Sequence, residues 1–321
     1  MRVLLAGDTH GNAGHMRRVL DVAAELDVDL VFQLGDFGYW EHEPSGVRYL
    51  DAVNRSARSC GVDVYFLDGN HDKSSLLMES YGDDRDEQGF VIVRPRVRYA
   101  PRGHRWSWRG TNFLAFGGAL SLDRERRLAE ERRRYEKALR KEGFRVGAGR
   151  PPTAVPTHAG SLWFPEEEGT DADVDTILTD PSPVDVLLTH DKPLRAAPEF
   201  NRKSEPRCLP NQARIQRLVD AYRPAVAAHG HLHFRYTEEL AHPDGSVTRV
   251  EGVAADPMAS HDVPGYRVAD SWLLLDPAAS PSPADADPDT VEATTGSRPA
   301  AGAERIASTK RGRVDNLGAH T

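Results

Sequence analysis

Short apolar runs alternate with amphipathic stretches through the first part of the chain. An apolar run at residues 3–6 is followed by polar loop residues, and further apolar runs cover residues 29–34 and 62–67. Between the first two runs, apolar residues recur at helical spacing, at Met16, Val19, Leu20, Ala23 and Leu26. This order predicts β-α units, and so an α/β fold with helices packed on the faces of a sheet.

Each of these three runs ends in polar residues. Asp8 and His10 follow the first, Asp36 follows the second, and the segment of residues 68–72 follows the third. In α/β sheets ligands bind at the carboxyl edge, because neighbouring loops converge there while helices cover the faces. The pattern therefore predicts a functional site at that edge.

From about residue 91 the apolar runs become shorter, and Pro and Gly turn signals separate them. We expect these runs to begin a second, more antiparallel sheet. Its expected strands are residues 91–93, 97–99, 111–116, 234–240, 247–253 and 271–275. Further strands are predicted at residues 184–188 and 225–228, on either side of a helical stretch at residues 212–222.

Two stretches depart from this pattern and set the domain boundaries. Residues 123–158 begin with a helix dominated by Arg, Glu and Lys and continue as a flexible Gly- and Pro-rich return. This insertion is either a solvated helix or an arm that contacts a partner or a polyanion. Residues 277–321 are rich in Ala, Pro, Ser, Asp and Thr, which bury too little apolar area to offset ordering entropy, so we expect a disordered tail after a domain of residues 1–276.

Composition and charge narrow the classes of protein. No run approaches the roughly 20 apolar residues of a membrane span, and the apolar run at the N-terminus is too short for a signal peptide. The net charge of -8 disfavours a broad nucleic-acid-binding surface, although a local basic patch is compatible with it. The two cysteines, Cys60 and Cys208, have no framework that indicates a disulfide. We expect a cytoplasmic protein.

The polar segments after the strands carry residues suited to metal chemistry. Asp8 and His10 lie two positions apart, and the carboxylate of Asp36 offers two oxygens that can bridge two cations. Asn70 supplies a neutral carbonyl ligand, and the adjacent His71 can point elsewhere as a proton donor. Each segment alone has a commonplace explanation, such as a helix cap or a turn.

Two later segments add imidazoles. His190 follows the run at residues 184–188, and His231 and His233 lie two apart on an extended segment, where they point to the same side. A neutral imidazole is a common metal ligand. Because all of these segments follow separate predicted strands, together they predict a metal centre. The neighbouring His229 is expected to be structural.

The ordered blocks Asp8-Thr9-His10, Gly35-Asp36, Gly69-Asn70-His71-Asp72, His190 and Gly230-His231-Leu232-His233 resemble the pattern of the calcineurin-like metallophosphoesterase superfamily. The resemblance spans roughly residues 3–275 apart from the charged insertion. It implies a two-sheet αββα sandwich with two divalent metal ions. One ion would be held by Asp8, His10 and His233, the other by Asn70, His190 and His231, and Asp36 would bridge them.

The resemblance also implies the catalytic residues His71 and Asp72. His71 would contact the phosphoryl oxygens and protonate the leaving group, and Asp72 would orient the loop or that histidine. Two metals about 3.5–4 Å apart would share a water that deprotonates near neutral pH, and the resulting bridging hydroxide would be the in-line nucleophile. Nitrogen and oxygen ligands without thiolate favour Mn, Fe, Zn, Co or Ni over Mg or Ca, and we expect Mn to serve in vitro.

The segment after Asp36 departs from the family pattern. Family members often carry Asp or Gly three positions after the bridging Asp, where this chain has Tyr39, and this weakens an interpretation as a protein phosphatase. Phe37, Tyr39 and Trp40 either stack on a base or aryl leaving group or simply pack. We expect a phosphatase or phosphodiesterase acting on a small phosphorylated or nucleotide-like substrate. The alternatives are a noncatalytic scaffold and a nucleic-acid-processing factor; nucleic acid is the less favoured partner.

Overall fold

The computed structural model describes residues 2–38, 44–141, 143, 160–198 and 205–276. The expected disordered tail and nearly all of the expected flexible return lie outside these residues. Within the described part of the chain, no helix combines the length and the apolar character that a membrane span requires.

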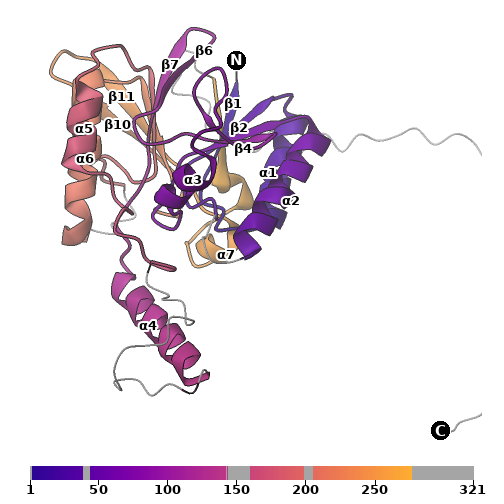
Figure 1. Ribbon diagram of the computed structural model, residues 1–321. Helices are drawn as coiled ribbons and strands as arrows, with labels where there is room; N and C mark the ends of the chain where they lie inside the picture. The colour runs from indigo at the N-terminus through magenta and orange to yellow at the C-terminus, as the bar shows by residue number, and fades with distance from the viewer. Residues whose placement is uncertain (1, 39–43, 142, 144–159, 199–204, 277–321) are drawn as a thin grey trace, which may run out of the picture. The chain divides into compact units, whose positions relative to one another are not determined.

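A mixed six-stranded sheet forms the first half of the core (Figure 1), in the order β12-β1-β2-β3-β5-β4. β1, β2, β3 and β5 run parallel, and β12 and β4 pair antiparallel at the two edges. The strands are β1 (Val3–Ala6), β2 (Leu30–Gln33), β3 (Asp63–Phe66), β4 (Val91–Arg94), β5 (Val97–Tyr99) and β12 (Trp272–Leu275). The carboxyl ends of β1, β2 and β3 therefore share one edge.

The second sheet is also six-stranded and mixed, in the order β10-β11-β9-β8-β7-β6. Its four central strands run parallel, and only the edge strands β6 and β10 are antiparallel. The strands are β6 (Arg105–Trp108), β7 (Thr111–Phe116), β8 (Val186–Thr189), β9 (Val226–His229), β10 (Tyr236–Ala241) and β11 (Val247–Gly252).

The expected division of strands between the sheets was wrong in three respects. β4 and β5 extend the first sheet, β12 pairs with β1 through the register Val3 to Leu275, and the second sheet is no more antiparallel than the first. An apolar run identifies a strand, but hydrogen bonds between distant segments decide which sheet it joins.

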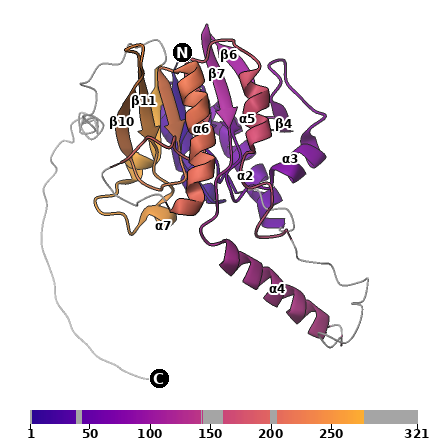
Figure 2. The same cartoon turned by 90° about the vertical axis from the view of Figure 1, so that its left-hand side faces the viewer.

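Helices cover the outer face of each sheet (Figures 1 and 2), so the predicted αββα sandwich is confirmed. α1 and α2 pack on the first sheet, and α5 and α6 pack on the second. The helices are α1 (Ala13–Glu25), α2 (Pro44–Cys60), α3 (Ser74–Tyr81), α4 (Arg124–Lys141), α5 (Asp171–Leu178), α6 (Leu209–Tyr222) and α7 (Pro257–Ser260), with short 3-10 helices at Pro206–Cys208 and Val268–Ser271.

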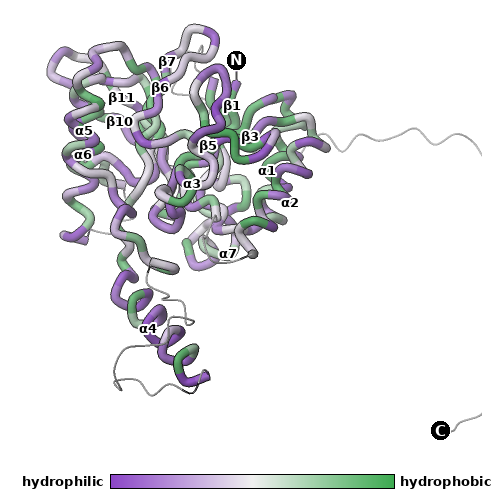
Figure 3. The backbone as a smooth tube through the Cα atoms, viewed as in Figure 1, coloured by the Kyte–Doolittle hydropathy of each residue, from purple (hydrophilic) through white to green (hydrophobic). Residues whose placement is uncertain are grey.

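Alternation along β1 shows how the layers are built. Leu4 and Ala6 face the helices α1 and α2, whereas Val3 and Leu5 face the second sheet. All four side chains are fully buried, as expected for a central parallel strand covered on both sides. By contrast, α4 is mostly hydrophilic along its length (Figure 3), as the charge pattern of the insertion predicted.

Candidate metal centre

The loops after β1 and β2 are bound to each other by backbone hydrogen bonds. The N–H groups of Thr9 and His10 both donate to the carbonyl oxygen of Asp36, at 3.2 and 2.8 Å. Gly69, after β3, has no room for a side chain, because an added Cβ would collide with the Asp36 carboxylate. An added Cβ at Gly230, after β9, would likewise collide with the Asp8 carboxylate. The carboxyl ends of strands from both sheets thus converge on the two carboxylates.

Backbone strain is concentrated at the same place. His10, Asp36, His231 and His233 all have positive φ, between 45° and 61°. A residue other than glycine adopts this left-handed conformation at an energetic cost, and such residues cluster at functional sites. The backbone here is shaped to direct side chains rather than to minimise local strain.

Asp36 lies at the centre of the predicted ligands. Its carboxylate oxygens lie 3.5 Å from His10 Nε2, 3.5 Å from His190 Nε2 and 3.7 Å from His71 Nε2. His233 Nε2 lies 3.1 Å from the carboxylate of Asp8. Three overlapping groups have ligand atoms within 4.8 Å of one another and could each hold a metal ion: Asp8, His10 and His233; His10, Asp36 and His71; and Asp8, Asp36 and His190.

The two remaining predicted ligands adjoin these groups. Asn70 Oδ1 lies 3.0 Å from His190 Nε2, and the ring of His231 lies 5.0 Å from the ring of His190. The backbone N–H of His231 also donates to Asp8 Oδ1 at 2.8 Å. The structure therefore gathers all seven residues predicted as ligands, which lie up to 225 positions apart in the sequence, at one edge of the two sheets.

The electrostatics of this cluster favour positive charge. Although burial opposes it, hydrogen bonds to Asp256 and Asp36 raise the pKa of His10 to about 11. Burial is also overcome at His190, whose pKa is raised to about 10 by the charge of Asp36. Against the effect of burial, the neighbouring histidines lower the pKa of Asp8 to about 2 and hold that of Asp36 well below its ordinary value. The site stabilises cationic charge, whether protons or metal ions carry it.

One oxygen of this cluster indicates that metal ions fit. Asp8 Oδ2 is fully buried and forms no well-oriented hydrogen bond with any of the described residues, although His233 Nε2 is 3.1 Å away. An unsatisfied buried carboxylate oxygen is costly, and a cation between it and the imidazoles would satisfy it. Carboxylate, amide and imidazole donors without thiolate suit a pair of divalent transition metals.

Asp256 is a site residue that sequence reasoning missed. It caps the N-terminus of α7, and its carboxylate lies 3.1 Å from His10 Nδ1 and 3.3 Å from Asn12 Nδ2. A carboxylate on the far nitrogen of a metal-binding histidine fixes the ring orientation and tautomer. His10 Nε2 is then left to face Asp8 and Asp36. Only an Asp-Pro pair at a helix start marks Asp256 in the sequence.

His229 and Phe37 have packing roles. His229 is buried at the end of β9, where Nε2 lies 2.6 Å from the Tyr236 hydroxyl, and burial lowers its pKa to about 4. Phe37 is fully buried and stacks on Phe66 with 4.3 Å between the ring centroids. Packing is therefore the correct interpretation for Phe37, whereas Tyr39 and Trp40 lie outside the described residues.

The carboxylate of Asp72 joins two of the site loops. It accepts hydrogen bonds from the N–H groups of Phe37 and Gly38, both at 2.9 Å, and of Gly69 at 3.0 Å. Burial, together with the charge of Asp36, raises its pKa to about 6, although the three N–H groups oppose this. Of the two orienting roles considered for Asp72, these contacts support that of holding the loops, and we treat it as a positioning residue.

We expect Asp72→Asn to lower the free energy of unfolding by about 1–3 kcal/mol, because an amide cannot accept all three hydrogen bonds and places its own N–H groups against a donor. Urea unfolding followed by circular dichroism measures this. Asp83→Asn makes the same substitution at an exposed residue and should leave stability unchanged. Equal stability of the two variants would show that Asp72 does not hold the loops.

His71 has a partner from the insertion. Arg127 Nη2, from α4, lies 3.1 Å from His71 Nε2. Burial lowers the pKa of His71 to about 4, and the charge of Arg127 acts in the same direction while that of Asp36 opposes it. The sequence placed Arg127 in a charged insertion, with no sign that it reaches the site. Arg127 is thus a contact of His71 that α4 provides.

The comparison with protein families agrees with this geometry. The family model described as calcineurin-like phosphoesterase matches residues 1–235. Among solved structures, TT1561 of Thermus thermophilus is 12% identical, with 86% of this chain and 98% of that chain covered and a TM-score of 0.45. A dimetal phosphatase from Danio rerio is 15% identical, with 79% and 87% covered and a TM-score of 0.45.

A third solved structure, an archaeal phosphodiesterase, is 10% identical, with 86% of this chain and 99% of that chain covered and a TM-score of 0.33. No curated protein matches the chain in sequence. The family match covers well over half of the chain and includes every predicted ligand. The chain belongs to the calcineurin-like phosphoesterase family.

Proposed function

We propose that this protein is a metal-dependent phosphoesterase that hydrolyses a small phosphorylated or nucleotide-like substrate. The observation that carries the proposal is the buried Asp36 carboxylate, whose oxygens lie 3.5 Å from Nε2 of His10 and 3.5 Å from Nε2 of His190, one proposed ligand of each ion. A ligand shared by two cations would lie between their other ligands in this way. Asp8, His10 and His233 would hold one ion, and Asn70, His190 and His231 the other.

Two divalent cations at these residues would supply an activated water and neutralise phosphoryl charge. The residues of the chain would orient the ligands and contact the substrate. Asp256 orients His10, and the carbonyl oxygen of Leu34, 2.7 Å from Nδ1 of His190, orients that ring. His71 faces the same carboxylate as the ligands, and its backbone N–H donates to Asp36 Oδ1 at 2.8 Å. In the proposed reaction its ring contacts the phosphoryl oxygens.

Removal of metal tests the proposal directly. We expect the purified protein with Mn²⁺ to hydrolyse p-nitrophenyl phosphate, bis-p-nitrophenyl phosphate or both, and EDTA-treated protein to lose at least about 10³-fold in kcat/KM. Readdition of Mn²⁺ should restore activity. Fe, Zn, Co and Ni complete the series, because the ligand set is compatible with each.

This experiment requires a control that the EDTA-treated protein is still folded. Circular dichroism before and after EDTA shows whether the metal-free chain keeps its secondary structure. Failure of the folded protein to hydrolyse either ester with every one of these metals would contradict the proposal and favour a scaffold that keeps the family fold. Hydrolysis that survives EDTA would contradict the metal-dependent mechanism.

A further inference from the structure

The insertion helix α4 brings a permanent positive charge to the candidate metal centre. Arg127 lies in the first turns of this helix, and its Nη2 lies 3.1 Å from His71 Nε2. That same imidazole nitrogen lies 3.7 Å from the Asp36 carboxylate. The guanidinium therefore stands immediately beside the residues proposed to act on the phosphoryl group.

Arg127 is held by further contacts that leave part of its guanidinium available. Nε donates to Asp123 Oδ1 at 2.7 Å, and Nη1 donates to the carbonyl oxygen of Leu162 at 3.0 Å. A guanidinium has five N–H groups. With His71 these partners use three of them, and the other two have no partner in the described parts of the chain. A fixed guanidinium with two available N–H groups matches the oxygens of a phosphate.

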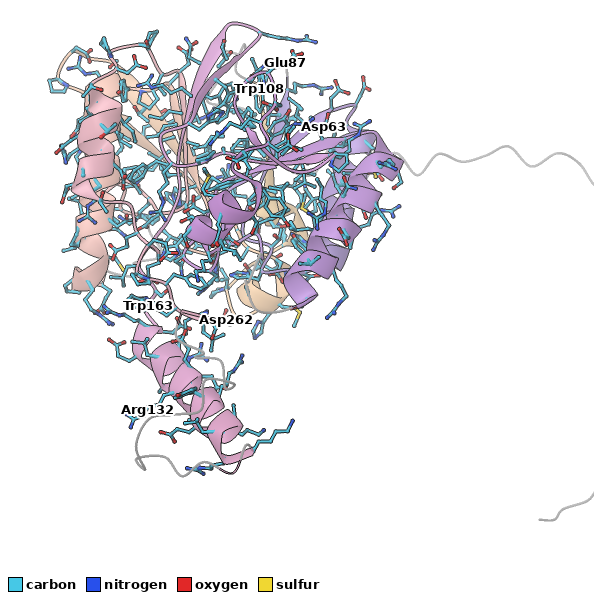
Figure 4. The ribbon with its side chains drawn as sticks, in the orientation of Figure 1. Asp63, Glu87, Trp108, Arg132, Trp163 and Asp262 are labelled. Atoms are coloured by element: carbon cyan, nitrogen blue, oxygen red, sulfur yellow. The ribbon has the colours of Figure 1, made fainter. Side chains whose placement is uncertain are left out.

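The start of α4 is itself anchored. Glu131 is buried, and its Oε1 accepts hydrogen bonds from the three backbone N–H groups of residues 161–163, at 2.7 to 3.0 Å. The Arg124 guanidinium lies 4.2 Å from the centroid of the Trp163 ring, which Figure 4 shows beside the first turn of the helix. Arg127 is thus positioned before substrate binds, which lowers the entropic cost of binding.

On the basis of the proposed function, we propose that Arg127 binds a nonbridging phosphoryl oxygen of the substrate and makes the site selective for phosphomonoesters over phosphodiesters. A monoester dianion has one more negative charge and one more unsubstituted oxygen than a diester. An additional fixed cation close to the phosphoryl group therefore stabilises a bound monoester more than a bound diester. The insertion is then part of the substrate site and not only a solvated helix.

Binding of inorganic phosphate tests this separately from turnover. We expect Arg127→Ala to weaken the affinity of the Mn²⁺-loaded protein for phosphate by about 10- to 100-fold in isothermal titration calorimetry, as expected when a charged hydrogen bond is lost. The control is Arg132→Ala, on the same helix (Figure 4). The Arg132 side chain is 80% exposed and pairs with Glu136. Arg132→Ala should bind phosphate like the unchanged protein, and both variants should retain the same metal content by mass spectrometry.

Selectivity is measured as the ratio of kcat/KM for p-nitrophenyl phosphate to that for bis-p-nitrophenyl phosphate. Arg127→Ala should lower this ratio at least about tenfold. Arg127→Lys keeps the charge but loses the paired N–H groups of the guanidinium, so its ratio should lie between those of the unchanged protein and Arg127→Ala. Unchanged phosphate affinity, or an equal loss for both esters, would overturn the proposal. If Arg127→Ala does not fold, Arg127→Lys decides by the same two measurements. If the unchanged protein hydrolyses neither ester, the proposed function fails, while the phosphate titration still tests Arg127.

Discussion

Asp36→Asn is expected to abolish hydrolysis, with a loss of at least about 10³-fold in kcat/KM, equivalent to about 4 kcal/mol of transition-state stabilisation. The substitution preserves the shape of a fully buried side chain but removes the charge that His10, His71 and His190 surround. An amide offers one neutral oxygen and cannot bridge two cations. We therefore expect the variant to bind fewer metal ions, as measured by inductively coupled plasma mass spectrometry.

Asp63→Asn is the matched control for this experiment. Asp63 begins β3, where its partly exposed carboxylate pairs with Arg96 and Arg98, both at 3.4 Å. Exposed ion pairs of this kind contribute about 0–1 kcal/mol to stability, and Asp63→Asn should keep full activity and metal content. Full activity in Asp36→Asn would rule out Asp36 as the shared ligand.

Arg102→Met is expected to cause the largest loss of stability, about 3–5 kcal/mol in the free energy of unfolding, because it leaves a buried carboxylate without its counter-ion. Asp68 is fully buried directly before the loop that carries Asn70, and Arg102 Nη2 and Nε bind it at 2.7 and 3.0 Å. The Tyr99 hydroxyl donates to the same carboxylate at 2.8 Å. Arg102 also donates to carbonyl oxygens of residues 166–168.

Urea unfolding of a double-mutant cycle separates these effects. Adding Asp68→Asn to Arg102→Met removes the uncompensated charge and should recover part of the lost stability. Arg17→Met is the control, because Arg17 makes an exposed pair with Asp21 at 2.9 Å and its loss should cost about 1 kcal/mol or less. Equal stability of Arg102→Met and Arg17→Met would show that the buried pair does not hold the loop.

Much of the fold was predictable because the apolar positions in the sequence are also the buried positions in the structure. The strands β1, β5 and β7 begin and end where they were predicted: β1 is continuously apolar, β5 alternates apolar and polar residues, and β7 ends in four apolar residues. α1 buries four of the five apolar positions that its spacing marked. By contrast, β6 was missed, because Arg105 and Ser107 alternate with Trp106 and Trp108 and interrupt the apolar run.

The candidate site, too, was predictable only in part. Its predicted ligands were identifiable because each follows a strand, and parallel strands bring their carboxyl ends to one edge. Arg127 and Asp256 were not identifiable, because their roles depend on contacts with residues far away in the sequence. The residues around Arg127 have the composition of a surface helix, and nothing in the local sequence distinguishes Arg127 from Arg126 or Arg132.

Residue type, spacing and position after strands were enough to identify the α/β class, the family pattern and the residues suited to metal chemistry. Which strands share a sheet, and which side chains orient the ligands, became known only from the folded chain. The folded chain also shows that the charged insertion reaches His71 through Arg127. Hydrogen bonds and charge interactions between distant segments set these features, and their energies depend on distances that only the folded chain defines.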